Sequence, residues 1–97
     1  MARTRKDYEA KDVAAAAGRM IRGLVKRAGT GDQEALYELV QLQDQLAAAI
    51  TEAGARMHVQ ADYSYSALAS ELGVSRQAAR QRFAPAVAQL QSQEAVA

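Results

Sequence analysis

The stretch DYSYSALASELGVSRQAARQRFAP, residues 62–85, decides the fold of the C-terminal part of this chain. It divides into a short helix that Ser64 can cap, a turn at Gly73, and a second helix that follows Ser75 and stops near Pro85. Glycine adopts the positive φ that such a turn needs without steric cost. Two helices joined by a short turn that contains glycine are the signature of a helix-turn-helix.

Helical periodicity separates the two sides of this motif. The first helix is expected to bury one apolar face, an apolar residue after the glycine fills the angle between the helices, and the second helix packs through its own apolar face. The predicted packing residues are Leu68, Ala69, Leu72, Val74, Ala78, Ala79 and Phe83. The residues left on the outward side of the second helix are Ser75, Arg76, Gln77, Arg80 and Gln81.

The segment SALASELGVSRQAA, residues 66–79, resembles the helix-turn-helix of small bacterial DNA-binding regulators. It is also similar to the promoter-reading helix-turn-helix at the end of sigma factors. The motif has a small residue, here Ala69, and a glycine at the turn, here Gly73. An apolar residue follows the glycine, here Val74, and a later buried position is occupied by Ala79. The sequence departs from the motif at Arg82, where an apolar residue is usual and is supplied instead by Phe83.

The resemblance implies that the helix over residues 76–84 inserts in the major groove of double-stranded DNA. Arginine pairs with guanine and glutamine with adenine, so the expected base-reading residues are Arg76, Gln77, Arg80 and Gln81. The expected phosphate contacts are Ser75, Arg82, Tyr65, Arg3 and Arg5. Two alternatives stay open: Tyr65 can instead anchor the core, and the outward face of the helix can be an ordinary solvated surface.

Two further helices are predicted before this motif. Residues 8–28 place apolar side chains at steps of three and four, and a turn follows at 29–31. Asp32 is a suitable N-cap for a second helix over 32–59, which Gly54 is expected to end early or bend. Methionines at helical spacing are assigned to the core, namely Met20 and Met57. A basic stripe on the first helix is either solvated or a second DNA contact: Arg19, Arg22, Lys26 and Arg27.

The helix over 32–59 carries a heptad seam. Its expected members are Leu36, Leu39, Gln43, Leu46, Ile50 and Ala53. Either the helix over 8–28 folds back along this seam as a hairpin, or a second chain covers it. Gln43 lies within the seam, where a polar residue sets register or oligomer state, or at its solvent edge. Leu, Ile, Val and Phe sum to only 18 residues, and self-association is a common remedy for so small a core. We therefore expect a homodimer.

Composition excludes several classes of protein. At 97 residues the chain is one domain's worth of length, and it has no cysteine for disulfides or thiolate sites. The single histidine, His58, has no metal-binding partner in the sequence pattern. The basic N-terminus lacks the apolar segment of a signal peptide, and no apolar run is long enough to span a membrane. We expect no enzyme activity, no cofactor and no small-molecule ligand, and a cytoplasmic, nucleoid-associated location.

The net charge of +1 conceals a strong segregation of charge. Residues 1–30 carry eight basic and three acidic residues (+5), residues 31–74 one and seven (−6), and residues 75–97 three and one (+2). Polyanion binding responds to local charge within a screening length of about 8–10 Å at physiological salt. The sequence therefore predicts that DNA binding concentrates at the two basic ends of the chain.

The predicted protein is all-α, with an N-terminal helix and a long helix, as a hairpin or coiled-coil-like pair, followed by a C-terminal helix-turn-helix. Its parts are a basic flexible leader (1–7), a helical packing or dimerisation module (8–60) and the DNA-binding segment with a short tail (61–97). The expected function is transcriptional regulation, as a repressor whose dimer places two recognition helices about 34 Å apart. The alternatives are a phage- or plasmid-type architectural, partition or excision factor, and a helical protein–protein interaction module.

Overall fold

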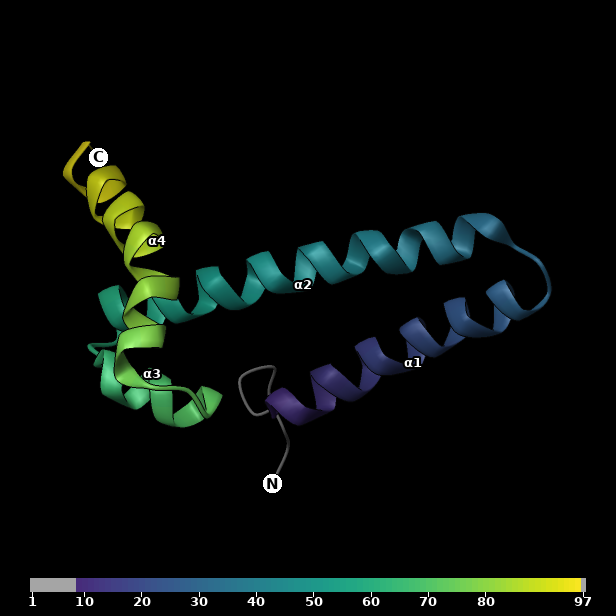
Figure 1. Cartoon of the computed structure of the whole chain (residues 1–97), viewed down its shortest axis with the longest axis horizontal. Helices are drawn as coiled ribbons and strands as arrows, with labels where there is room; N and C mark the ends of the chain where they lie inside the picture. Colours follow the sequence, from purple (N-terminus) through teal and green to yellow (C-terminus); the bar gives the residue numbers. More distant parts are fainter. Residues whose placement is uncertain (1–8, 97) are drawn as a thin grey trace, which may run out of the picture. The chain divides into compact units, whose positions relative to one another are not determined.

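A computed structural model describes residues 9–96 of the chain, and side chains up to residue 95 (Figure 1). These residues form four helices and no strand: α1 (Ala10–Gly29), α2 (Gln33–Gln60), α3 (Tyr65–Leu72) and α4 (Arg76–Val96). The all-α class is therefore confirmed. The chain divides into two units, an N-terminal unit up to Asp44 and a C-terminal unit from Gln45, so that α2 contributes to both. The expected leader over residues 1–7 lies outside the described residues.

In the N-terminal unit, local chemistry defines the turn between α1 and α2. Thr30 donates its hydroxyl to the carbonyl of Arg27 at 2.7 Å, and Arg27 forms an exposed ion pair with Asp32 at 3.3 Å. Asp32 Oδ1 accepts the backbone N–H of Ala35 at 3.2 Å, which confirms the predicted N-cap of α2. A helix that starts with a cap still needs packing to be stable, and this unit supplies little of it.

Among residues 9–44, Ala35 is the one buried residue, with 3% of its surface exposed. Val13 and Met20 of α1 are 64% and 75% exposed. The assignment of Met20 to the core was wrong, because none of residues 9–44 covers it. Helical spacing identified the apolar face of α1 but could not show whether another element packs against it.

The core of the protein lies in the C-terminal unit, where α3 and α4 pack against each other and against the last turns of α2. Its buried residues are Ala55, Leu68, Ala69, Ala79, Phe83 and Val87. Partly buried apolar residues surround them: Met57, Val59, Tyr65, Ala86 and Leu90. The predicted core positions Met57, Leu68, Ala69, Ala79 and Phe83 are therefore confirmed.

The predicted helix over 32–59 is confirmed, since α2 continues past Gly54 to Gln60. The expected stop near Pro85 was wrong, because Pro85 lies inside α4. Proline removes one backbone hydrogen bond from a helix, at a cost of about 3 kcal/mol. Beyond Pro85, Val87 and Leu90 contact the core, so continuing the helix buries apolar surface that offsets this loss. The predicted recognition segment 76–84 is the first part of a longer helix.

Candidate nucleic-acid interface

The turn between α3 and α4 is closed by backbone and side-chain hydrogen bonds. Ser64 Oγ accepts the N–H of Ala67, and Ser75 Oγ accepts the N–H of Ala78, each at 3.0 Å. Both predicted N-caps are thus confirmed. Such caps satisfy backbone donors that have no partner inside the helix, and they fix where each helix begins.

Gly73 ends α3 in the left-handed conformation, with φ 68° and ψ 33°. The N–H of Gly73 donates to the carbonyl of Ser70 at 3.4 Å, and that of Val74 donates to the carbonyl of Ala69 at 3.1 Å. This pair of bonds is a Schellman motif, which turns the chain sharply after a helix. The glycine predicted at the turn therefore has the backbone conformation that was expected of it.

The interior of the motif is smaller than predicted. Leu72 and Val74 are 38% and 44% exposed, and Ala78 is exposed as well. These three were wrongly assigned to the packed side. Leu72 and Val74 lie at the turn after α3, whereas the buried Leu68 and Ala69 lie in the middle of α3 and are part of the core. Distance from the core, rather than hydropathy, determines their exposure.

In the first turns of α4, two residues one helical turn apart are buried, and the polar residues around them are exposed. Ala79 and Phe83 are 0% and 1% exposed and anchor the helix to the core. The outward residues are all exposed: Arg76, Gln77, Arg80, Gln81 and Arg82. Within residues 9–96, no carboxylate forms an ion pair with any of these three arginines. The structure thus brings the four expected base-reading residues to one exposed helix surface, with their donor groups available for a ligand.

Two of the expected phosphate contacts lie beside this surface. Ser75 is exposed, and because its oxygen accepts the Ala78 N–H, its hydroxyl hydrogen remains free to donate. Arg82 is exposed, with its guanidinium carbon 5.8 Å from the centre of the Phe83 ring. Arg3 and Arg5 lie outside the described residues.

Tyr65 occupies a different environment from these residues. Its ring stacks on His58 of α2, with 4.3 Å between ring centres and an interplanar angle of 15°, and it packs against the core. His58 Nδ1 lies 2.7 Å from the carbonyl oxygen of Tyr63, and because a carbonyl only accepts, Nδ1 carries the hydrogen. Tyr65 therefore has the core-anchoring role that the sequence left open. No sequence pattern indicated this stack, which joins two elements across the turn between α2 and α3.

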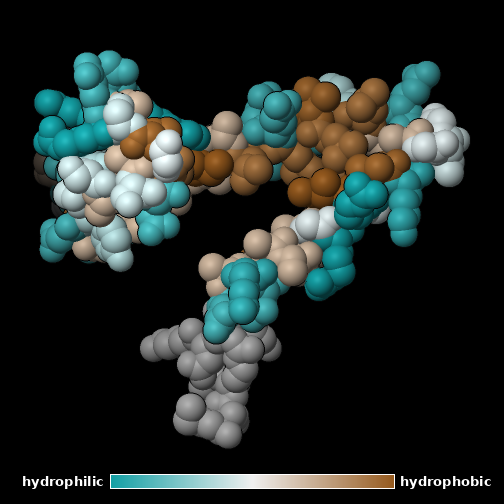
Figure 2. Space-filling view, turned by 60° about the horizontal axis from the view of Figure 1, so that its bottom comes forward, coloured by the Kyte–Doolittle hydropathy of each residue, from teal (hydrophilic) through white to brown (hydrophobic). Residues whose placement is uncertain are grey.

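The seam predicted on α2 is largely uncovered. Leu36, Leu46 and Ile50 are 60%, 60% and 36% exposed, Leu39 is half-buried, and Gln43 and Ala53 are exposed. Figure 2 shows hydrophobic side chains, in brown, gathered along α2. Helix geometry brings the seam residues to one side of this helix.

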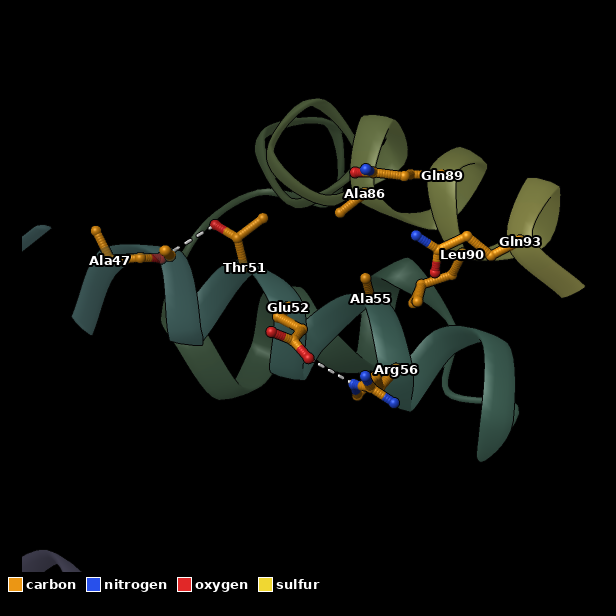
Figure 3. Close-up of a pocket in the computed structure, with 10 residues that line it drawn as sticks. Ala47, Thr51, Glu52, Ala55, Arg56, Ala86, Gln89, Leu90 and Gln93 are labelled. Carbon is orange, nitrogen blue, oxygen red and sulfur yellow. Dashed lines mark hydrogen bonds and ion pairs between the residues drawn. The ribbon is translucent and has the colours of Figure 1, made fainter. Parts of the chain in front are cut away.

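A groove between α2 and α4 in the C-terminal unit was not predicted (Figure 3). It has a volume of about 640 Å³ and is lined by alanines and Leu90, with polar groups at its rim. Glu52 and Arg56 form an ion pair there at 2.8 Å, and Thr51 donates its hydroxyl to the carbonyl of Ala47 at 3.2 Å. Gln89 and Gln93 of α4 also line the groove, so polar and apolar groups contribute to its surface in similar measure.

Within residues 9–96, no three histidine, aspartate or glutamate side chains lie close enough together to hold a metal ion. In the same part of the chain, no helix has both the length and the apolar character to cross a membrane. A comparison with protein-family models finds no match for the chain, and comparisons with curated proteins and with solved structures find none either.

Proposed function

We propose that this chain is a non-enzymatic, sequence-specific double-stranded-DNA-binding protein whose residues 76–84 enter the major groove. The observation that carries this proposal is that buried residues anchor the start of α4 while the polar residues beside them are exposed. Ala79 and Phe83 hold the helix to the core, while the side chains of Arg76, Gln77 and Arg80 project from it. A helix fixed in this way presents its side chains without a large ordering cost, which favours recognition of a partner.

The chemistry of the outward face suits base edges in the major groove. Arg76 and Arg80 each offer a planar set of donors for the O6 and N7 acceptors of guanine, and Gln77 and Gln81 match the N6 and N7 of adenine. A well-formed bidentate pair contributes about 1–3 kcal/mol of discrimination between bases. Ser75 and Arg82 would hold the phosphates that flank the bases being read.

The function that we propose on this basis is transcriptional regulation on the nucleoid, with repression by occlusion of the promoter. An architectural, partition or excision factor of phage or plasmid type would use the same helix surface. The distribution of bound sites in the genome separates the two roles: one or a few operators support the regulator, whereas clustered repeats or broad coverage contradict it and support the architectural role.

Selection of bound sequences from random DNA, followed by fluorescence anisotropy on the selected duplex, tests DNA reading. We expect a defined consensus for the native chain, and for Arg76→Ala/Arg80→Ala a loss of affinity together with a loss of preference for that consensus. The matched control is Arg19→Ala/Arg22→Ala, which removes the same charge from exposed positions of α1. This control should retain the consensus. Unchanged affinity and consensus in the α4 variant would overturn the assignment of the recognition helix.

One observation favours a second function. Val13 and Met20 are large apolar residues that are well exposed on α1, as on a helix that binds another protein. A native chain that binds neither random nor selected DNA at moderate salt would contradict the DNA-binding proposal and support a helical interaction module.

A further inference from the structure

An exposed apolar surface follows α2. Leu36, Val40 and Leu46 are 60%, 50% and 60% exposed, although leucine and valine favour burial. α1, which belongs to the same unit as Leu36 and Val40, leaves both residues uncovered. A contiguous surface of this kind on a helix marks a site where another molecule binds.

The order of residues along this surface matches a two-stranded coiled coil. In a heptad written a to g, Leu36, Gln43 and Ile50 take the a positions. Leu39, Leu46 and Ala53 take the d positions. Ile50, the one β-branched residue at an a position, and the leucines at two d positions are residue types found in parallel two-stranded coiled coils. The positions on either side of the seam, e and g, hold no charge between residues 35 and 49: Ala35, Val40, Leu42, Ala47 and Ala49.

Gln43 indicates which molecule covers the seam. It is the one polar residue at an a or d position between Leu36 and Ala53, and covering the seam would bury its amide. A buried amide must find both a donor and an acceptor, because an unsatisfied polar group costs about 1–3 kcal/mol. In a parallel pair of identical helices the a residues face each other across the two-fold axis. A second Gln43 then supplies the missing donor and acceptor reciprocally.

We propose that α2 pairs in parallel with α2 of a second copy of this chain, with Gln43 of each copy hydrogen-bonded to the same residue of the other. The charged residues of this part of α2 are then on the outside of the pair, at positions b and c: Glu38, Asp44 and Glu52. The pairing goes beyond DNA binding and does not depend on it, so it is measured in the absence of DNA.

Disulfide trapping tests the parallel register directly, because the native chain contains no cysteine. We expect Gln43→Cys to form a covalent dimer under mild oxidation at micromolar concentration. The matched control is Gln45→Cys, which alters the same residue type only two positions away but at an exposed outer position. A cross-link at position 43 and little at position 45 supports the proposal. An equal yield at the two positions, or none at position 43, overturns it.

Sedimentation equilibrium of the native chain tests the pairing itself, and a monomer throughout the micromolar range overturns the proposal. Leu46→Asp should weaken self-association by at least about tenfold, because it would place an unpaired carboxylate in the seam. Leu46 is well exposed in the single chain, so the helix content of this variant should be retained by circular dichroism. Gln43→Leu should strengthen association and allow larger oligomers, since a polar a residue limits oligomer state at a cost in stability. A Gln43→Leu variant that associates more weakly contradicts the proposed amide pair.

Discussion

Gly54 of α2 and Phe83 of α4 are in direct contact, with the ring of Phe83 seated against the helix backbone where Gly54 has no side chain. A Cβ at position 54 would lie 2.6 Å from Cζ and 2.7 Å from Cδ1 of that ring. Phe83 is 1% exposed and is the largest fully buried side chain among the described residues. This contact joins the proposed recognition helix to α2, so the orientation of α4 depends on a residue that lacks a side chain.

The first prediction concerns this contact. Gly54→Ala should lower the free energy of unfolding by about 1–3 kcal/mol, as overpacking does in well-packed cores. This direction is opposite to helix propensity, by which alanine is favoured over glycine by about 1 kcal/mol. Chemical denaturation monitored by circular dichroism measures the change.

Gly18→Ala provides the control for Gly54→Ala. Gly18 also lies inside a helix, but an added Cβ there meets nothing within 4 Å. The control should therefore leave stability unchanged or raise it. If Gly54→Ala stabilises the protein as much as Gly18→Ala does, the ring of Phe83 is not held in the position described.

The second prediction concerns Pro85, which is exposed inside α4. Pro85→Ala should raise the free energy of unfolding by up to about 3 kcal/mol, because it restores a backbone donor and removes a steric conflict with the preceding turn. Thermal unfolding measures this change. Ala88→Gly, at a nearby exposed position of the same helix, should lower the free energy of unfolding instead. A loss of stability in Pro85→Ala would contradict a continuous α4 from Arg76 to Val96.

The third prediction separates the two roles considered for Tyr65. Tyr65→Phe keeps the ring that stacks on His58 and should leave stability within about 0.5 kcal/mol of the native value, whereas Tyr65→Ala should lose about 3 kcal/mol or more. Denaturation measures both variants, and anisotropy with the selected DNA measures the hydroxyl's contribution. Because the ring is part of the core, we expect Tyr65→Phe to retain DNA affinity. If Tyr65→Phe clearly lost DNA affinity at unchanged stability, this result would support a contact between Tyr65 and a phosphate.

The fourth prediction concerns the start of the proposed recognition helix. Ser75→Ala removes the acceptor for the Ala78 N–H and should cost about 1 kcal/mol of stability. Ser75→Asp keeps an acceptor and should restore stability, but its negative charge should weaken DNA binding. Denaturation and anisotropy together measure the two effects. If Ser75→Asp binds DNA as tightly as the native chain, phosphate does not lie at this end of α4.

Much of the fold could be predicted because its signals are local in the sequence. Asp32, Ser64 and Ser75 each cap a helix through a backbone N–H three residues away, and Gly73 needs only its own backbone freedom to close the turn. The exposure of Arg76 and Arg80 follows similarly from helix periodicity once Ala79 and Phe83 are recognised as packing residues. Interactions between residues so close along the chain do not depend on how distant elements pack.

The remaining features depend on contacts between residues far apart in the sequence. Gly54 and Pro85 both disfavour helix by their local preferences, yet each lies inside a helix. Position 54 has no room for a side chain because the ring of Phe83 packs there. The burial of Val87 stabilises the helix beyond Pro85. The exposure of Met20 likewise depends on which elements pack together. By itself, the sequence determined the capped helices and the glycine turn, since hydrogen bonds within a few residues specify them. Only the tertiary structure decided which apolar faces are covered and where the last helix ends, because burial energy arises when distant segments meet.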